Sequence, residues 1–375
     1  MIQRKPHADR KRMFGSIYNK SFLQSSSVIR DLCQETVVQR LLPIIETAAV
    51  QRNPVNVLEY SSTIYMDFIS AFIFGLQNSA NFLQDSQARR RWLERRTLTK
   101  GYGFWASEFP ALTTLLMKMG IHLEPPEINF AWDEVKDLCL DMLQKAEKSS
   151  KEGPKNGVQT EPVVYDQLLK QFNSSNDKKS SAPLSDSQSR LSIASELMDH
   201  IFAGTDTTSW TLAHLMHELS QRPDLQSALR TELRLLSPPI VYPSSTSIKE
   251  SSEVQSKLPS SRSIDSLPLL DAVLMETLRL RPSVPGSQPR TTPPSDPRSP
   301  ISICGYTNIP AGIRVSAQAY SLHRNPEVFP KPEVWKPERW LDADQDKRDE
   351  MMKWFWAFGS GGRMCIGNNL AIIGE

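Results

Sequence analysis

Residues 358–367 constrain the fold of this chain more than any other stretch, because their composition suits one kind of turn. Glycines at positions 359, 361 and 362 let the backbone turn tightly and approach a flat ligand. Cys365 follows them, and residues 368–373 predict the start of a helix. Because N–H groups at a helix N-terminus stabilise negative charge, a cysteine placed there favours its thiolate form. The stretch therefore predicts a thiolate at the end of a glycine turn, with Arg363 placed to meet a carboxylate.

A glycine-rich stretch can also belong to a purely structural loop or to a phosphate-binding loop. In a structural loop the cysteine would be buried and would need no ligand. A phosphate-binding loop is excluded, because no Lys-Ser or Lys-Thr pair follows the glycines. The remaining cysteines, Cys33, Cys139 and Cys304, are widely spaced and form no Cys-x-x-Cys pair, which excludes a disulfide scaffold and a zinc ribbon. They are predicted to be small buried residues.

Apolar residues recur at helical spacing through most of the chain before residue 281. The helices predicted from this spacing cover residues 31–49, 55–76, 86–100, 129–148, 190–221, 224–236 and 267–280, with polar linkers at 149–161 and 173–187. Residues 282–340 predict turns and short strands, including strands at 301–303 and 313–315. The predicted fold class is mainly α in the α+β sense, a helical body with a small β-sheet. Residues 1–375 are predicted to form one domain, in which the Ser- and Pro-rich residues 237–266 are a disordered insertion.

The charge balance limits the class of partner. Lys+Arg is 44 and Asp+Glu is 42, so the net charge of +2 favours neither nucleic acid nor an anionic membrane. The longest apolar tract, residues 64–76, is interrupted by Asp67 and is too short to span a bilayer.

Residues 101–126 gather aromatic and aliphatic side chains between prolines and glycines. This segment is expected to be core, with a pocket lid and a membrane-surface patch as alternatives.

A polar motif lies within the long helix predicted at residues 190–221. Gly204 and Thr205 are poor residues for a helix interior, so a widened turn is expected to open there. Asp206 and Thr207 place a carboxyl and a hydroxyl side by side, as a proton relay requires. The alternative is a polar helix face in which the threonine bonds its own backbone.

Four motifs resemble those of the cytochrome P450 family and occur in the same order. Residues 358–367 match the family's haem-binding signature at each fixed position, and residues 203–208 match its oxygen-activation motif. Residues 276–279 resemble the family's Glu-x-x-Arg, and residues 337–340 resemble its Pro-Glu-Arg motif. The resemblance covers nearly the whole chain and implies the cytochrome P450 fold. It also implies a buried structural network of Glu276, Arg279 and Arg339, in which breaking one pair costs about 3–5 kcal/mol.

The resemblance implies a set of site residues. Cys365 would be the axial ligand of the iron in haem b, and Asp206 and Thr207 would be catalytic. The other residues implied to bind the haem are Phe358, Gly359, Gly361, Arg363, Gly367, Arg290, His7, Lys11 and Ala203. The residues implied to contact the substrate are Leu197, His200, Ile201, Ala203, Val284, Pro285, Gly286 and Ser287, under a roof of residues 104–119.

The activity implied by the resemblance is that of a haem-thiolate monooxygenase of fungal, microsomal-like type. Such an enzyme inserts one oxygen atom from O2 into a small hydrophobic organic substrate, here in secondary metabolism or detoxification. Its electrons come from NADPH through NADPH-cytochrome P450 reductase. The alternatives are a haem-thiolate isomerase, dehydratase or peroxygenase, and a non-catalytic remnant that loads no haem. The acid–hydroxyl pair favours the monooxygenase, and the chain is expected to be a monomer with no nucleic-acid partner.

Compared with the family's pattern, the chain is expected to be truncated at both ends. The N-terminal membrane anchor, the first strands and helices, and a final hairpin are expected to be missing. A complete member would lie on the cytosolic face of the endoplasmic reticulum membrane, whereas this chain, which shows no anchor, would be cytoplasmic. The strands near residues 313–317 and Pro289 are expected to lose their pairing partners, so that the chain alone binds haem weakly.

Overall fold

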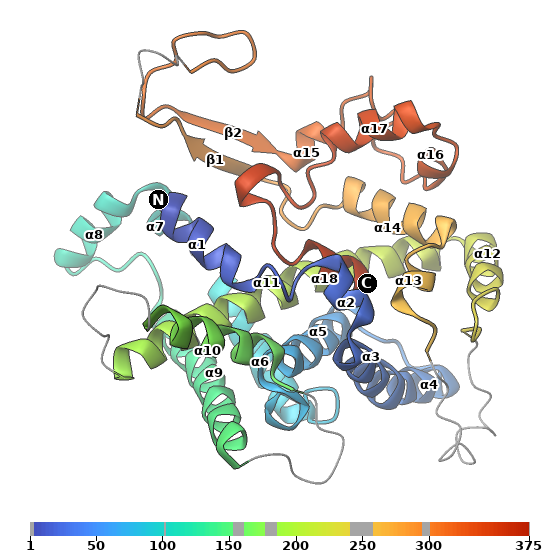
Figure 1. Ribbon diagram of the computed structural model, residues 1–375, viewed down its shortest axis with the longest axis horizontal. Coiled ribbons are helices and arrows are strands. Elements are labelled where there is room, and N and C mark those ends of the chain that lie inside the picture. The colour runs from blue at the N-terminus through green and yellow to red at the C-terminus, as the bar shows by residue number, and fades with distance from the viewer. Residues whose placement is uncertain are drawn as a thin grey trace. The chain divides into compact units, whose positions relative to one another are not determined.

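The computed structural model describes residues 4–100, 103–152, 161–176, 186–240, 258–294 and 301–374. The chain divides into two compact units, whose elements are labelled in Figure 1. The first unit comprises residues 1–209 and 369–371, and the second comprises residues 210–368 and 372–375. Most described residues are helical and the described sheet has two strands, so the predicted mainly α fold with a small sheet is confirmed. The assignment of the whole chain to one domain stays a prediction.

The first unit is built of helices around α5 (Val57–Phe74). Its other elements are α1 (Arg4–Phe14), α2 (Lys20–Ser25), α3 (Ser27–Cys33), the π-helix η1 (Gln34–Leu41), α4 (Leu42–Gln51), the 3-10 helix η2 (Leu76–Asn78), α6 (Ser86–Lys100), α7 (Gly103–Glu108), α8 (Pro110–Lys118), α9 (Pro126–Glu152), α10 (Val163–Asn176) and the N-terminal part of α11 (Asp186–Ser220). The helix α5 begins where the side chain of Asn56 accepts a hydrogen bond from the N–H of Glu59. It ends at Gly75, whose φ of 82° is a conformation that favours glycine.

Asp67, which interrupts the apolar tract in the sequence, is fully buried in α5. Its carboxylate accepts hydrogen bonds from the backbone N–H groups of Phe82 and Leu83 at 2.7 and 3.0 Å. Nη1 of Arg40 lies 3.8 Å from the same carboxylate. Burial outweighs these contacts and raises the pKa of Asp67 to about 6. The residue therefore anchors the loop that follows α5 to the core of the first unit.

Six of the seven predicted helices are present as single α-helices, and their ends agree with the prediction to within about four residues. The helix predicted at residues 31–49 is instead divided among α3, the π-helix η1 and α4. The two polar linkers are shorter than predicted, because residues 149–152 continue α9 and residues 173–176 continue α10. The last turn of α9 is supported by an ion pair of 3.7 Å between Lys148 and Glu152, four residues apart. Residues 186–187 belong to α11, and residues 153–160 and 177–185 lie outside the described residues.

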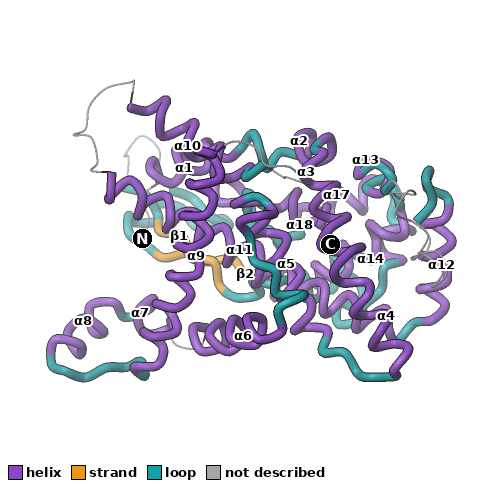
Figure 2. The backbone as a smooth tube through the Cα atoms, turned by 90° about the horizontal axis from the view of Figure 1, so that it is seen from below, coloured by secondary structure: helices purple, strands orange, loops and turns teal. Residues whose placement is uncertain are grey.

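The expectation that residues 101–126 form core is wrong for the described part of the segment. Figures 1 and 2 show α7 and α8 at the margin of the first unit. The large side chains of these helices and of the turn that follows are exposed: Phe104, Trp105, Phe109, Leu112, Leu115, Met117, Met119 and Ile121. Two helices of six and nine residues are too short to bury both faces, and their aromatic rings pack mainly on one another. Their role as a pocket roof stays a prediction.

The second unit is organised around α14 (Pro268–Leu280), which is buried from Ala272 to Leu280. One side of α14 packs with a cluster that includes Leu215, Leu229 and Trp335. Another side packs with Phe329, Trp340 and Met351. The other elements of this unit are the C-terminal part of α11 (residues 210–220), α12 (Pro223–Arg234), α13 (Ser261–Ile264), β1 (Ser287–Thr291), β2 (Arg314–Gln318), α15 (Ala319–Leu322), α16 (Glu338–Leu341), α17 (Gln345–Trp354) and the 3-10 helix η3 (Gly361–Arg363). The terminal helix α18 (Asn368–Gly374) carries residues of both units.

The strands β1 and β2 pair with each other in antiparallel register, with Arg290 opposite Val315. Figure 1 shows the two strands side by side as arrows. The expectation that these strands lack partners is therefore wrong. The strand predicted at residues 313–315 is present as β2, whereas residues 301–303 contribute only an isolated bridge between Ile303 and Tyr306. Cys304 lies in the turn of this bridge with a φ of 51° and is exposed, so its predicted burial is wrong. Cys139 is buried as predicted, and Cys33 is partly buried.

Part of the predicted insertion at residues 237–266 lies outside the described residues, namely 241–257. The short helix α13 occupies its C-terminal end, where the hydroxyl of Ser260 accepts a hydrogen bond from the N–H of Ser263 at 3.1 Å. Disorder of the central residues stays a prediction. Among the described helices, none combines the length and the apolar character needed to cross a membrane.

Candidate functional site

The loop that carries Cys365 is closed by its own backbone. The N–H of Cys365 donates to the carbonyl of Phe358 at 2.9 Å, and the N–H of Gly359 donates to the carbonyl of Trp356 at 3.0 Å. Gly359 and Gly361 adopt φ values of 68° and 65°, which favour glycine strongly over other residues. The predicted glycine turn is therefore present, and Cys365 lies at its end, three residues before α18 begins.

The surface of this loop suits a planar group bound through sulfur. Cys365 is exposed, and a side chain added at Gly361 or Gly362 would meet no atom within 4 Å. A Cβ at Gly359 would instead lie 3.1 Å from Oε1 of Gln288 on β1, so a side chain there would require that amide to shift slightly. An exposed thiol beside an open, side-chain-free backbone fits the donor set and the approach that a haem with a thiolate ligand requires.

Two arginines predicted to meet the carboxylates of the haem lie in the same unit as Cys365. Arg290 is exposed on β1, where its Nη1 donates to the carbonyl of Pro289 at 2.9 Å. Arg363 is partly exposed in η3, within the Cys365 loop. Both positions are compatible with binding an anionic group, and their contact with haem stays a prediction. Gly367 follows Cys365 closely enough that a Cβ built on it would lie 3.8 Å from Sγ of Cys365.

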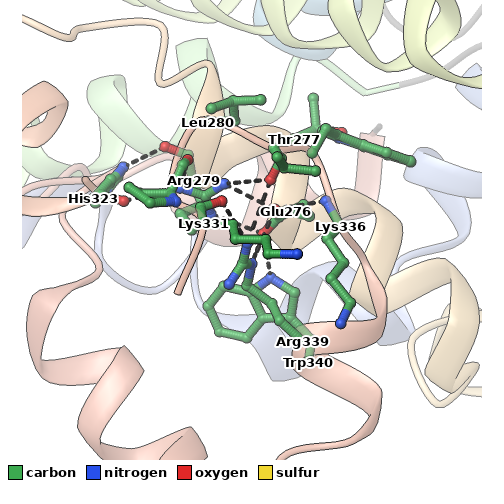
Figure 3. A network of polar contacts seen from close by, with 12 residues as sticks. Glu276, Thr277, Arg279, Leu280, His323, Lys331, Lys336, Arg339 and Trp340 are labelled. Carbon is green, nitrogen blue, oxygen red and sulfur yellow. Dashed lines mark hydrogen bonds and ion pairs between the residues drawn. The ribbon is translucent and has the colours of Figure 1, made fainter. Parts of the chain in front are cut away.

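Figure 3 shows the buried ion network around Glu276, which the structure assembles from α14 and α16. Nε of Arg279 donates to Oε2 of Glu276 at 2.8 Å, and Nη2 donates to Oε1 at 2.8 Å. Nε of Arg339 donates to Oε1 of Glu276 at 3.0 Å. The side chains of Glu276 and Arg279 are fully buried. The three residues predicted to meet are therefore together.

Further bonds satisfy the remaining polar atoms of this network. Oε1 of Glu276 accepts the backbone N–H of Lys336 at 2.8 Å, and Oε2 accepts Nε1 of Trp340 at 3.0 Å. Nη1 of Arg279 donates to the carbonyls of His323 and Pro332 at 2.9 and 2.8 Å. A buried ion pair stabilises a fold only when its other hydrogen bonds are made, and this condition is met here.

His323 is a buried residue whose contacts the motif comparison did not reveal. Its ring is fully buried between α14 and the residues before the Cys365 loop. Burial lowers the pKa of His323 to about 4, and the positive charges of Arg279 and Arg324 act in the same direction. Arg324, its neighbour, pairs with Glu333 at 2.9 Å and donates to the carbonyl of Leu280 at 3.0 Å. Arg324 therefore binds the C-terminal end of α14.

The lowered pKa of His323 predicts an acid-dependent loss of stability. Below its ordinary pKa of 6.5 the unfolded chain takes up a proton that the folded chain does not bind until pH reaches about 4. The free energy of unfolding should therefore fall as pH drops from 6.5 to 4, by about 2–3 kcal/mol from this residue. Urea unfolding at pH 7.0 and 4.5 would measure it, with wild type compared with H323Q. His217→Gln, at an exposed position, should retain the wild-type pH dependence. An equal pH dependence in wild type and H323Q would contradict the prediction.

The motif at residues 203–208 lies in an unbroken α-helix, because α11 runs without interruption from Asp186 to Ser220. The expected widened turn is therefore absent. The hydroxyl of Thr207 donates to the carbonyl of Ala203 at 2.7 Å, and the hydroxyl of Thr208 donates to the carbonyl of Gly204. The glycine has a packing reason instead, since a Cβ at Gly204 would lie 2.9 Å from Cδ1 of Ile69 on α5. Glycine thus permits the close approach of α11 to α5 within the first unit.

Asp206 forms an ion pair with Arg96 of α6, a residue that the motif comparison did not identify. The guanidinium of Arg96 lies 4.2 Å from the ring centre of Phe202, and its Nη1 donates to the hydroxyl of Thr99 at 2.7 Å. Only 7% of Arg96 is exposed, so this cation is held in one place. No sequence signal distinguishes it, because α6 contains five arginines at positions 89, 90, 91, 95 and 96.

The other predicted residues of the first unit lie on α1 and α11. His7 and Lys11 are partly exposed on α1, and Ala203 is exposed on α11. Leu197 and Ile201 are buried among other side chains. Nδ1 of His200 lies 2.8 Å from the hydroxyl of Tyr18, and burial lowers the pKa of His200 to about 4. The second set of predicted substrate contacts, Val284 to Ser287, is exposed before and at the start of β1. Contact of either set with a substrate stays a prediction.

Comparison with known proteins finds one family. The family model described as Cytochrome P450 matches residues 5–374. The Cytochrome P450 monooxygenase avaI of Aspergillus versicolor is 27% identical over 100% of this chain and 80% of its own length. The Cytochrome P450 monooxygenase FGM1 of Gibberella zeae is 26% identical over 94% of this chain and 64% of its own length. Cytochrome P450 3A7 of Homo sapiens is 28% identical over 85% of this chain, which spans 56% of that relative. The chain thus spans less than two thirds of the last two proteins.

Proposed function

Since this chain belongs to the cytochrome P450 family, we propose that it acts as a haem-thiolate monooxygenase with Cys365 as the axial ligand of the haem iron. The observation that carries the proposal is the loop of residues 358–367. It exposes one thiol at the end of a turn that needs glycine at positions 359 and 361. The names of the two fungal relatives, both monooxygenases, support the same activity.

The residues proposed to hold the haem follow the family's motifs. Phe358, Gly359, Gly361 and Gly367 shape the loop around the thiolate. The proposed partners of the haem carboxylates are Arg363, Arg290, His7 and Lys11, and Ala203 is proposed to contact the haem from α11. When bound, haem b supplies the chemistry of O2 activation, and the cysteine thiolate favours cleavage of the O–O bond by donating electron density. NADPH and its P450 reductase are the proposed source of electrons.

Asp206 and Thr207 are proposed to deliver protons. The hydroxyl of Thr207 donates its only proton to the carbonyl of Ala203 at 2.7 Å, and its lone pairs remain able to accept a hydrogen bond. To deliver that proton, the hydroxyl must release the carbonyl of Ala203 and take up a replacement proton from its donor. The ion pair with Arg96 holds the carboxylate of Asp206, and exchange of this partner for water would release Asp206 to pass a proton onward. The proposed substrate is a small hydrophobic organic molecule in secondary metabolism or detoxification. We also propose that the protein is a monomer associated with the endoplasmic reticulum.

Titration of the 375-residue chain with haem, followed by reduction under CO, tests the proposal directly. A saturable complex whose reduced CO form has a thiolate-type absorption band supports it, and NADPH-dependent turnover with reductase separates a monooxygenase from an isomerase or peroxygenase. A chain that is folded by circular dichroism and shows no saturable haem binding would contradict the proposal and favour a non-catalytic remnant.

Replacing Thr207 with Ala is expected to uncouple electron use from product formation. A positioned proton donor contributes about 10²–10⁴-fold to a proton-transfer step, so product formed per NADPH consumed should fall at least about tenfold. Thr97→Ala on α6 is the matched control, because it removes the same kind of bond, from a hydroxyl to the carbonyl four residues earlier, at an exposed position. Unchanged coupling in T207A would count against the relay.

A further inference from the structure

The further inference concerns His323, a buried residue to which the proposed reaction assigns no role. His323 lies directly after α15, and its ring contacts two parts of the second unit that are far apart in sequence. One is the end of α14, which carries the ion network, and the other is the backbone just before the Cys365 loop. Figure 3 shows the ring beside Arg279.

The hydrogen bonds of the ring define its protonation state. The backbone N–H of Trp356 donates to Nε2 of His323 at 2.6 Å, so this nitrogen must carry a lone pair. Nδ1 lies 2.7 Å from the carbonyl oxygen of Arg279, which can only accept, so the proton resides on Nδ1. The ring is thus neutral and in a single tautomer.

Packing holds the ring in this orientation. The ring of Phe355 stacks on His323 with centroids 5.3 Å apart and planes 18° apart. The ring of Phe329 contacts it edge-on at 6.5 Å. The backbone of His323 is tied as well, since its carbonyl accepts Nη1 of Arg279 at 2.9 Å. The ring therefore cannot rotate away from Trp356 without disturbing the core around α14.

A series of backbone hydrogen bonds leads from this ring to the cysteine. The carbonyl of Trp356 accepts the N–H of Gly359 at 3.0 Å. The carbonyl of Phe358 accepts the N–H of Cys365 at 2.9 Å. The position of Trp356 thereby sets where the glycine turn begins, and the turn sets where the thiol lies.

We propose that His323 is a positioning residue, which fixes the Cys365 loop to the Glu276–Arg279–Arg339 network by presenting an unprotonated nitrogen to the N–H of Trp356. The consequence for the haem thiolate rests on the proposed function, whereas the positioning of the loop does not. The ion network then has a second effect besides stability. The backbone carbonyl of Arg279 orients the ring of His323, and the guanidinium of Arg279 binds the backbone carbonyl of His323.

The charges around the ring favour the neutral form. Burial is the largest cause of the lowered pKa of His323, whereas the hydrogen bond to the backbone carbonyl of Arg279 raises that pKa. The positive charges of Arg279 on α14 and of its chain neighbour Arg324 lower the pKa further. Glu276 and Glu333, the acidic partners of these two arginines, bind them directly. Protonation would place an N–H of the ring against the N–H of Trp356, so acid should release the loop.

Three variants at position 323 test the role of the ring nitrogen. H323F keeps the ring shape and removes both bonds. H323Q can present an oxygen near the position of Nε2, and H323N can present one only near Nδ1. His217→Gln, at an exposed position, is the control. Amide hydrogen exchange of the haem-free chain, followed by mass spectrometry, measures opening of residues 355–365.

We expect the rate of amide exchange across residues 355–365 to rise roughly fivefold to tenfold in H323F, which is the factor for one lost buried hydrogen bond. The exchange rate should return towards the wild-type value in H323Q but not in H323N. The haem-loaded chain should show the same order of variants in the fraction of reduced CO complex with the thiolate-type band. Unchanged exchange in H323F, or an equal rise in α14 and the rest of the second unit, would overturn the proposal. If exchange behaves as expected while wild type shows no thiolate band, the proposed function fails and the positioning role stands.

Discussion

Cys365→Ser is expected to abolish the thiolate-type band of the reduced CO complex while the chain stays folded. Serine is nearly the same size, and its hydroxyl remains protonated at neutral pH, so it cannot replace the thiolate as a ligand. Because Cys365 is exposed, the free energy of unfolding should change by less than about 0.5 kcal/mol. The measurement is the CO difference spectrum of wild type and variant at equal protein concentration, checked by circular dichroism.

The matched control for this experiment is Cys304→Ser. Cys304 is also exposed and lies in the second unit, but in the turn between Ile303 and Tyr306 and not in the glycine loop. The control should keep the full spectrum. A thiolate band that persists in C365S, or that disappears in the Cys304 variant, would refute the assignment of the ligand.

Glu276→Gln is expected to lower the free energy of unfolding by about 3–5 kcal/mol, the cost of leaving buried charges without their partner. The carboxylate of Glu276 binds two arginines, one backbone N–H and one indole, and its side chain is fully buried. Glutamine retains one acceptor oxygen and places an NH2 group against donors. Since domains are stable by only about 5–15 kcal/mol, this is a large fraction of the total. Urea unfolding followed by circular dichroism would measure the loss.

Glu333→Gln provides the comparison for the ion network. Glu333 also pairs with an arginine, Arg324, at 2.9 Å, but 67% of its side chain is exposed. An exposed ion pair contributes about 0–1 kcal/mol, so this variant should stay close to wild type. If Glu276→Gln and Glu333→Gln destabilise the chain equally, the buried network does not have the structural role assigned to it.

Some features could be predicted from the sequence because their physics is local. Gly359 and Gly361 adopt positive φ, a requirement that favours glycine in the sequence. Glu276 and Arg279 are three residues apart on one helix, so their contact follows from helix geometry. The helices themselves follow from apolar spacing, which is why their ends agreed closely with the prediction.

Other features were predicted wrongly from the sequence, because the same residues are compatible with two different structures. Gly204 and Thr205 suggested a widened turn, yet α11 is continuous, since threonine hydroxyls bond the carbonyls one turn earlier and glycine fits against Ile69. Residues 101–126 suggested core, yet α7 and α8 leave their large side chains exposed. The hydrophobic composition of a segment does not determine whether another part of the protein packs against its side chains.

By itself, the sequence determined the glycine turn before Cys365, the helical body and the charge pair on α14, because each depends on residues within a few positions of one another. Only the tertiary structure decided the partners that come from far along the chain. Asp206 pairs with Arg96 across 110 positions, and His323 accepts the N–H of Trp356 across 33. The residues next to Arg96, which is one of five arginines on α6, do not indicate its partner in the sequence. The residues next to His323 do not indicate its partner either. Burial brings these groups together, and the cost of leaving a buried polar atom unpaired is what selects the contact.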